Sequence, residues 1–364
     1  MNNRRDWLKL TVLGTLGVGI IPIETFAKPI TNKFTHLLDN RINLRSNENP
    51  YGPSKLAKDA MIENVNVSNR YGWNITYQLI SELAMKNDVS QNNILLGAGS
   101  TELLDLVFQY ASQNEGSYIL ADTTYDYWTS SKTSNFQEIR VPLTKDKKHN
   151  LSAMVKKVRP DTKLIYICNP NNPTGTIISK KDLVSFIGNV PKETLILVDE
   201  AYINFSNQDS LSDLTVNNEN LVVAKTFSKL YGLAGARVGY ITASENTIQK
   251  FKKLQSWPNG SLSVVSMAGA LASLNDEKFK NEVRTLNSKT KEFTVNELKK
   301  LNIPSIPSFS NFLYFSLENY KKDFFKQLEM HNIVGTKIYE ENGKWSRITI
   351  GTLEEMKSFI KAIA

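Results

Sequence analysis

The feature that most constrains how this chain of 364 residues folds is the alternation of short apolar runs with amphipathic helical patterns between residues 94 and 241. Near-continuous apolar runs separated by helices are typical of strands buried on both faces of a parallel sheet. We therefore expect an α/β domain with a mainly parallel sheet between helices. The expected strands are ILL (94–96), SYIL (117–120), KLIYIC (163–168), TLILV (194–198), NLVVA (220–224) and VGYIT (238–242).

After Ser244 the pattern becomes helical, and strands follow at residues 310–317 and 345–350, which indicates a smaller α+β unit. The helical spacing is carried by Phe279, Val283, Leu286 and Phe293. A chain of this length exceeds what one hydrophobic core usually serves, so two domains are expected. The expected small domain comprises residues 28–64 and 262–364, from the two ends of the chain. The expected large domain comprises residues 65–261.

Composition argues against several classes of protein. The net charge of +8 is spread in short groups of lysines, with no basic block interleaved with aromatic residues, which favours a solvated surface over nucleic-acid binding. The single cysteine, Cys168, excludes an internal disulfide and a metal cluster of several cysteines. The three histidines lie far apart in the sequence, at positions 36, 149 and 331, so no metal site is expected.

Residues 1–27 have the character of an export signal. Three basic residues precede an uncharged run of fourteen residues at 10–23, and small residues follow at the two positions that a signal peptidase reads, Thr25 and Ala27. The run is shorter than the roughly 20 apolar residues of a membrane helix. We therefore expect the signal to be removed, without stable insertion of the mature protein in the membrane.

The paired arginines Arg4 and Arg5 resemble the twin-arginine signal, although Asn3 replaces the usual Ser or Thr and Trp7 the usual Phe. The resemblance implies an exported, periplasmic protein whose mature chain begins near Lys28. An uncleaved N-terminus that anchors the protein to the membrane is the alternative.

Polar sequences follow four of the expected strands. In an open α/β sheet, ligands bind beyond the carboxyl ends of the strands, so we expect these four segments to meet at one edge. They are GAGSTE (97–102), NPNNPTG (169–175), DEAY (199–202) and FSK (227–229).

GAGST opens a helix whose free N–H groups and positive dipole end suit a phosphate, and the hydroxyls of Ser100 and Thr101 add donors. Asp199 directly follows a buried strand, where a carboxylate is costly without a partner such as a protonated ring nitrogen. Taken one at a time, the segments also have purely structural interpretations. Ser is a common N-cap, DEAY is also typical of a helix start, NPNNPTG of a tight loop, and Lys229 of a surface lysine.

In their order and spacing, the segments match a family pattern. NPNNPTG, DEAY and the pair Ser228-Lys229, followed eight residues later by Arg237, resemble the fold-type I pyridoxal-phosphate aminotransferases, most closely the histidinol-phosphate aminotransferase subfamily. The similarity extends from RSNENPYGPS (45–54) to SRITIG (346–351). It implies that Lys229 forms a Schiff base with pyridoxal 5'-phosphate.

The resemblance also implies cofactor contacts for the matching residues. Asp199 is expected to pair with the ring nitrogen and keep it protonated, so that the ring serves as an electron sink. Tyr202 and Asn172 are expected to hydrogen-bond the 3'-oxygen, and Tyr125 to stack on the ring. The residues expected to hold the phosphate are Gly99, Ser100, Thr101, Ser228 and Arg237.

Tyr71 resembles the tyrosine that reaches the phosphate from the neighbouring subunit, which implies a homodimer with shared active sites, although Gly72 replaces the usual proline. Arg347 matches the arginine that binds the anionic group of the substrate. Lys337 stands where the family has a second arginine, and Tyr51 is expected to line the same pocket. A surface or packing role is the alternative for Lys337 and Tyr51.

These roles imply an aminotransferase that moves an amino group between an amino acid or histidinol phosphate, with an aromatic or imidazole side chain favoured, and a 2-oxo acid such as 2-oxoglutarate. Lys229 is expected to act as anchor and as general base, with Asp199 and Tyr202 in the catalytic set. Lys337 offers a point charge in place of a planar fork, which argues against histidinol phosphate. Two alternatives stay open, a decarboxylase of the threonine-phosphate type and a non-catalytic binding protein.

Overall fold

The computed structural model describes residues 41–127, 135–340 and 343–364, and residues Ile42–Ala364 form one compact unit. The expected export signal and the first residues of the expected small domain lie outside the described residues. Both assignments, and the division into two domains, therefore stay predictions. None of the described helices is long and apolar enough to cross a membrane.

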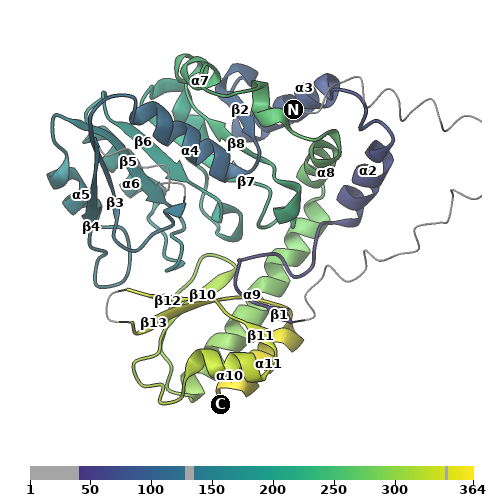
Figure 1. Cartoon of the computed structure of the whole chain (residues 1–364), viewed down its shortest axis with the longest axis vertical. Coiled ribbons are helices and arrows are strands. Elements are labelled where there is room, and N and C mark those ends of the chain that lie inside the picture. The colour runs from purple at the N-terminus through teal and green to yellow at the C-terminus, as the bar shows by residue number, and fades with distance from the viewer. Residues whose placement is uncertain (1–40, 128–134, 341–342) are drawn as a thin grey trace, which may run out of the picture. The chain divides into compact units, whose positions relative to one another are not determined.

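The largest sheet has seven strands in the order β2-β8-β7-β6-β5-β3-β4 (Figure 1). They are β2 (Ile94–Gly97), β3 (Gly116–Ala121), β4 (Phe136–Val141), β5 (Thr162–Cys168), β6 (Leu195–Asp199), β7 (Leu221–Thr226) and β8 (Gly239–Thr242). Neighbours among β3 to β7 pair in parallel, whereas β8 runs antiparallel to both β2 and β7. The expectation of a mainly parallel α/β sheet is confirmed.

Two features of this sheet were not predicted. Strand β4 lies at the edge and its central residues are partly exposed, so it lacks the apolar run that marks a strand buried on both faces. Strand β8 is apolar, but apolarity does not reveal its reversed direction. Because Gly239 pairs with both Gly97 and Thr226, β8 begins at the edge where β2 and β7 end.

Apolar side chains cover both faces of the sheet because successive strand residues point to opposite sides. On β5, Leu164 and Tyr166 pack on one face, while Ile165 and Ile167 pack on the other. The first face is covered by α4 (Ser100–Ala111) and α7 (Glu245–Lys252), and the second by α5 (Leu151–Lys157) and α6 (Lys180–Gly188).

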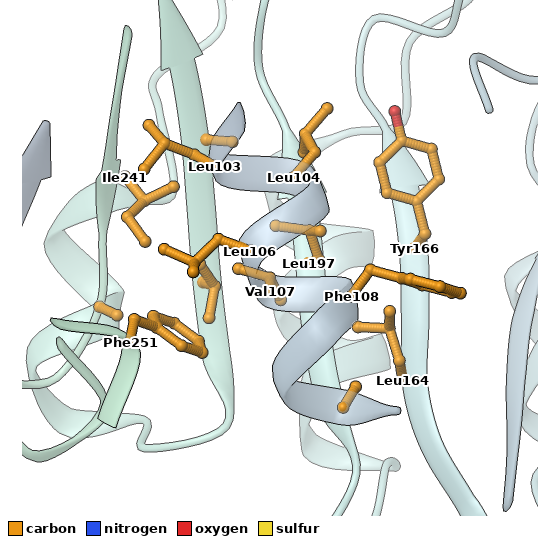
Figure 2. Packing of buried hydrophobic residues seen from close by; sticks show 14 of the residues in the cluster. Leu103, Leu104, Leu106, Val107, Phe108, Leu164, Tyr166, Leu197, Ile241 and Phe251 are labelled. Carbon is orange, nitrogen blue, oxygen red and sulfur yellow. The ribbon is translucent and has the colours of Figure 1, made fainter. Parts of the chain in front are cut away.

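Helix α4 has the apolar face that its spacing predicts. Figure 2 shows its side chains packed against residues of the strands, among them Leu164, Leu197 and Ile241. The residues of this face are all buried: Leu103, Leu104, Val107, Phe108 and Ala111. Burying one leucine side chain contributes about 1.5–3 kcal/mol to the stability of the fold. Packing of this face therefore holds α4 against the sheet, with the start of the helix at the edge of the sheet.

A second sheet, in the order β12-β13-β10-β9, is antiparallel. Its strands are β9 (Ser305–Ile306), β10 (Phe312–Ser316), β12 (Ile338–Tyr339) and β13 (Trp345–Thr349), and β1 (Ile42–Asn43) pairs separately with β11 (Ile333–Val334). The remaining helices are α2 (Lys55–Val65), α3 (Trp73–Asn87), α8 (Val264–Leu274), α9 (Glu277–Lys300), α10 (Phe324–Met330) and α11 (Leu353–Ile363). The predicted late helix and strands are α9, β10 and β13, and α9 runs from beside α8 to the second sheet (Figure 1).

Candidate active site

The carboxyl ends of the parallel strands meet at one edge and bring the polar segments together. The N–H of Asn169 donates to the carbonyl of Asp199, and the N–H of Glu200 donates to the carbonyl of Ala224, both at 2.8 Å. The segments after β5, β6 and β7 therefore leave the sheet side by side. Strand β2 ends at the same edge because β2 and β7 are both antiparallel to β8.

Asp199 is the last residue of β6 and is only 2% exposed. Its Oδ1 accepts the N–H of Ala201 at 3.0 Å, and its Oδ2 accepts the hydroxyl of Tyr166 at 3.1 Å. Burial raises the pKa of Asp199 to about 6, while the two donors and Lys229 act in the opposite direction. A buried carboxylate of this kind suits a cationic partner.

The hydroxyl of Tyr202 lies between two amides. It accepts from Nδ2 of Asn47 at 3.0 Å and from Nδ2 of Asn172 at 3.3 Å. Burial raises the pKa of Tyr202, although the cation of Arg347 opposes the shift, so the phenol keeps its proton. The phenol can therefore donate to an oxygen of a ligand.

Lys229 follows β7 and is partly buried. Its Nζ donates to the carbonyl of Ser46 at 3.0 Å and lies 5.7 Å from the centre of the Tyr202 ring. Burial lowers the pKa of Lys229 to about 8, and the nearby cation of Arg347 lowers it too, while nearby carboxylates oppose the shift. The neutral amine, which acts as nucleophile or base, is therefore abundant near pH 8.

A cup for an anion forms where α4 begins. The first N–H groups of a helix have no acceptor within the helix, and here they belong to Ser100 and Thr101. Gly99 has a φ of 80°, and a Cβ at this position would lie 2.3 Å from Nη2 of Arg237. A Cβ on Gly239 would lie 2.5 Å from the backbone nitrogen of Ser100. The two glycines therefore keep the cup open.

Arg237 and Ser228 complete the cup. Nη1 of Arg237 donates to Oγ of Ser228 at 3.4 Å and to the carbonyl of Ala234 at 3.0 Å. Arg237 has a left-handed backbone, with a φ of 54°, two residues before β8 begins. The reversed direction of β8 is what brings this arginine to the edge of the sheet.

Tyr125 lies beside the cup. It shares a hydrogen bond of 3.3 Å with the hydroxyl of Thr101, and the segment that carries it is held by Arg140, whose Nη2 donates to the carboxylate of Asp126 at 2.6 Å. Burial raises the pKa of Tyr125, and the charge of Asp199 adds to that shift. Tyr125 is therefore tied to the cup through Thr101, and its stacking on the cofactor ring stays a prediction.

Arg347 reaches this cluster from β13. Its Nη1 donates to Oδ1 of Asn172 at 2.5 Å and its Nη2 to the carbonyl of Arg45. The guanidinium carbon lies 5.4 Å from the ring centre of Phe312 and 5.9 Å from that of Tyr339. Its Nε is buried and has no hydrogen-bond partner in the described part of the chain. The two hydrogen bonds use two of the five N–H donors of Arg347, and the buried Nε–H is among those left for an acceptor on a ligand.

Lys337 lies in the same neighbourhood but is exposed. Its Nζ is 5.2 Å from the ring centre of Tyr339 and 5.7 Å from that of Tyr127. Because the guanidinium of Arg347 also contacts Tyr339, two cations lie near one aromatic ring.

Tyr71 lies apart from this cluster and is 76% exposed. Its ring centre is 5.8 Å from that of Trp73 and 6.0 Å from that of Trp257. The three rings border a cavity of about 280 Å³. We call these three residues the aromatic surface.

Tyr51 is turned towards the helices. Burial raises the pKa of Tyr51, a hydrogen bond with Thr290 of α9 opposes that shift, and the charge of Glu355 adds to it. Over the described residues, Tyr51 shares no hydrogen bond or ring contact with Lys229. Its place in a substrate pocket stays a prediction.

The sequence reasoning missed two residues of the site. Asn47 hydrogen-bonds Tyr202 across 155 positions, and Tyr166 hydrogen-bonds Asp199. The turn-rich segment NENPYG was a possible signal for Asn47, which has a φ of 54°. The signal for Tyr166 was a hydroxyl in the middle of an apolar strand.

An ion pair that was also missed ties the two sheets together. Nζ of Lys147, in the segment after β4, lies 2.7 Å from Oε2 of Glu340, which follows β12. The hydroxyl of Tyr314 donates to Oε1 of Glu340 at 2.8 Å, and Lys147 also lies 4.8 Å from the ring centre of Trp345. The sheet that carries Arg347 is thereby fastened to the larger sheet.

The residues present fit pyridoxal 5'-phosphate. The cup suits its phosphate, Asp199 suits a protonated ring nitrogen, Tyr202 suits the ring oxygen, and the amine of Lys229 suits an aldehyde. The glycines support this fit, because a Cβ on Gly99 would press against the guanidinium of Arg237 and a Cβ on Gly239 against the N–H of Ser100, two of the groups that would hold the phosphate.

Comparison with known proteins shows which family the chain belongs to. The family description "Aminotransferase class I and II" matches residues 39–363. The chain is 34% identical over 343 residues to the histidinol-phosphate aminotransferase of Caldicellulosiruptor saccharolyticus, covering 92% of this chain and 95% of the relative. It is 32% identical over 328 residues to that of Moorella thermoacetica, covering 88% and 84%.

A solved structure gives the same result for the fold. Histidinol-phosphate aminotransferase from Sinorhizobium meliloti, in complex with pyridoxal-5'-phosphate, superposes with a TM-score of 0.81 at 23% identity, covering 88% of this chain and 89% of that chain.

Fold and site together define a transferase of fold type I that uses pyridoxal phosphate. The chain belongs to the aminotransferase class I and II family, because the family match covers nearly all of its length. The expectations of the fold class, of an aminotransferase and of pyridoxal 5'-phosphate as cofactor are confirmed.

Proposed function

We propose that this aminotransferase takes its amino group from a donor with an aromatic or imidazole side chain and an anionic group, and transfers it to a 2-oxo acid such as 2-oxoglutarate. Histidinol phosphate, for which the relatives are named, is one such donor. The observation that carries the proposal is Arg347, which is held by Asn172, flanked by the rings of Phe312 and Tyr339, and has a buried Nε without a partner among the described residues.

Each residue of the site has a task in this reaction. Bound pyridoxal phosphate supplies an electron-withdrawing ring that stabilises negative charge at the α-carbon of the substrate. Lys229 would hold the cofactor through Nζ until the substrate amine takes its place there. The freed, neutral Nζ would then accept the α-proton. Asp199 keeps the ring nitrogen protonated. Arg347 binds the anionic group of the substrate and fixes its orientation.

A donor screen tests the proposal. Each amino compound is added to the purified, cofactor-loaded protein without a 2-oxo acid, and conversion of the cofactor to its pyridoxamine form is followed by absorbance. We expect conversion by aromatic and imidazole donors, histidinol phosphate included, and its reversal by 2-oxoglutarate. Release of carbon dioxide without amino transfer would instead support the decarboxylase.

Arg347→Ala tests the anion site. Hydrogen bonds to charged groups contribute about 1.5–3 kcal/mol, so we expect KM for anionic donors to rise by roughly 10- to 100-fold. Lys337→Ala should raise KM less, because Lys337 is exposed. The control is Arg159→Ala, at an exposed arginine paired with Asp161. If KM stays unchanged for every donor in Arg347→Ala, the anion site lies elsewhere.

We propose a homodimer with shared active sites, in which Tyr71 of one subunit reaches the phosphate cup of its partner. The support is the exposed apolar surface of this region, since large patches of this kind mark interaction sites. Its exposed residues are Leu56, Ile62, Val65, Val67, Tyr71, Trp73, Tyr77 and Trp257. Sedimentation of the purified protein at several concentrations tests the oligomeric state, and a monomer throughout would contradict the proposal.

We also propose that residues 1–27 direct export by the twin-arginine route to the periplasm, with a mature chain that begins near Lys28. The support is the Arg4-Arg5 pair and the need to load a cofactor before crossing the membrane. Replacing both arginines with lysine should trap an active, cofactor-bound enzyme in the cytoplasm. Equal export and processing of that variant would instead favour a general secretory signal or an uncleaved anchor.

A further inference from the structure

Tyr166 lies on the face of the sheet that carries Asp199. Cys168 of β5 is the register partner of Asp199, and Tyr166 precedes Cys168 by two residues, so both side chains point to the same face. Ala224 of β7 is the register partner on the other side. Both partners are small, which leaves room for the phenol beside the carboxylate. Figure 2 shows the hydroxyl of Tyr166 directed towards the end of α4 that holds Leu104.

The contact between the two side chains is a buried, directional hydrogen bond. The hydroxyl of Tyr166 lies 3.1 Å from Oδ2 of Asp199, and neither residue is accessible enough for water to compete. Burial raises the pKa of Tyr166 well above its usual value, so the phenol is the donor. The other oxygen of the carboxylate accepts the N–H of Ala201.

Few other groups stabilise the carboxylate. Lys229 favours its charged form and Glu200 disfavours it, so the two charges act against each other. Tyr125 and Cys168 also face Asp199 but are neutral, because burial raises the pKa of each. The hydrogen bonds from Tyr166 and Ala201 are therefore the main opposition to the cost of burial.

We propose that Tyr166 is a positioning residue whose hydroxyl keeps Asp199 ionised, so that the shared proton stays on the ring nitrogen of bound pyridoxal phosphate. This inference rests on the proposed function through its cofactor. Without the phenol donor, the pKa of Asp199 would rise and the carboxylate would compete more strongly for that proton. To the extent that Asp199 took the proton, the ring would lose the charge that makes it electron-withdrawing.

The test uses Tyr166→Phe, loaded with pyridoxal phosphate that carries ¹⁵N in its ring. We expect the ¹⁵N chemical shift of a protonated ring in the parent and a shift towards the neutral ring in Tyr166→Phe at the same pH. An unchanged shift in cofactor-loaded Tyr166→Phe overturns this inference alone. A parent protein that binds no cofactor overturns the proposed function and this inference together.

Tyr118→Phe is a matched control. Tyr118 is also fully buried, packs on the same face of the sheet and donates to a carboxylate, that of Glu138, at 2.5 Å. We expect Tyr118→Phe to change the stability of the fold but to leave the ¹⁵N shift at the value of the parent. If Tyr118→Phe moves the shift as far as Tyr166→Phe, the effect is general to buried tyrosines and the inference fails.

Kinetics supply a second measurement. We expect kcat of Tyr166→Phe to fall roughly tenfold, because the variant lacks one hydrogen bond to a charged group. KM should stay within about twofold of the parent. A change in KM with kcat unaffected would place Tyr166 in substrate binding and overturn the inference.

Discussion

The sheet edge that carries Asp199 and Lys229 differs from the aromatic surface in how much of its side-chain contact one chain supplies. At the edge, Asp199 accepts two hydrogen bonds and Lys229 donates one, and all of these contacts come from the same chain. On the aromatic surface, Tyr71, Trp73 and Trp257 expose 76%, 46% and 42% of their area. The side chains of the first region are held by hydrogen bonds within the chain, whereas the second region presents aromatic rings to solvent.

This difference separates the tasks that one chain performs from those that require a second copy. The chemistry depends on buried groups with shifted pKa values, which the fold of one chain supplies. Assembly, and the last contact to the cofactor phosphate, depend in our proposal on the aromatic surface. Substitutions at the edge should therefore act on rate, and substitutions on the aromatic surface on association.

The largest effect is expected for Lys229→Ala. Turnover should fall by at least about 10³-fold, within the range for loss of a general base, while the cup still binds the cofactor. The measurements are steady-state rate and bound cofactor by absorbance. Lys291→Met is the control, because burial also lowers the pKa of Lys291 to about 8, outside the site. An unchanged rate in Lys229→Ala would remove this lysine from catalysis.

Asp199→Asn should stabilise the apoenzyme. The pKa of Asp199 is raised from 3.8 to about 6 in the fold, so the folded protein holds the proton more tightly than the unfolded chain, and the free energy of unfolding falls as pH rises from about 4 to 6. Asparagine removes this loss, which is at most about 3 kcal/mol.

Urea unfolding of the apoenzyme measures this gain, which should appear above pH 6 and be absent below about pH 4. Asp161→Asn, at an exposed carboxylate beside Arg159, is the control. An equal gain at both pH values would mean that ionisation of Asp199 is not its cause. The same variant, loaded with cofactor, should lose more than tenfold in turnover, about 1.4 kcal/mol of barrier.

A smaller effect, about tenfold in cofactor affinity, is expected for Tyr71→Ala, since one hydrogen bond to a charged phosphate is lost. Mixing Tyr71→Ala with Lys229→Ala sharpens the comparison. If active sites are shared, mixed dimers contain one site with both native residues, so activity should exceed the mean of the two variants. Activity equal to that mean after subunit exchange would show that each site uses Tyr71 and Lys229 of one chain.

The smallest effect concerns pH. The pKa of Lys229, about 8, predicts that the apoenzyme takes up pyridoxal phosphate faster as pH rises, with a plateau above that value, because the neutral amine attacks the aldehyde. Arg347→Gln removes a cation that lowers this pKa, so the midpoint should move to higher pH. Rapid-mixing absorbance measures it, with Arg159→Gln as control. A midpoint that moves to lower pH would contradict the assigned cause.

The sequence predicts the residues of the site that follow strands, because an apolar run and the polar loop after it are both local patterns. Asp199 and Lys229 lie at the ends of recognisable apolar runs, and the start of α4 is marked by glycines and hydroxyls. The site contacts that depend on distant segments were missed. Asn47 hydrogen-bonds Tyr202 because the N-terminal segment that carries Asn47 lies against this edge of the sheet. No local sequence pattern predicts that contact.

Tyr166 was missed for a different reason. In KLIYIC it satisfies the pattern of a buried strand, and its ring does pack in the core. Only the register between β5 and β6 shows that its hydroxyl meets a carboxylate. The ring of Tyr166 belongs to the core, while its hydroxyl belongs to the site. A hydrophobicity scale does not reveal such a double role.

The pair Lys147 and Glu340 joins the two sheets by a contact that dissolved salt should weaken little. The two residues are 193 positions apart and both are only partly exposed, at 21% and 16%. Any breathing motion that separates the two sheets must break this pair together with the hydrogen bond from Tyr314. Dissolved salt screens partly buried charges much less than exposed ones, so the contact between the two sheets should persist at high ionic strength.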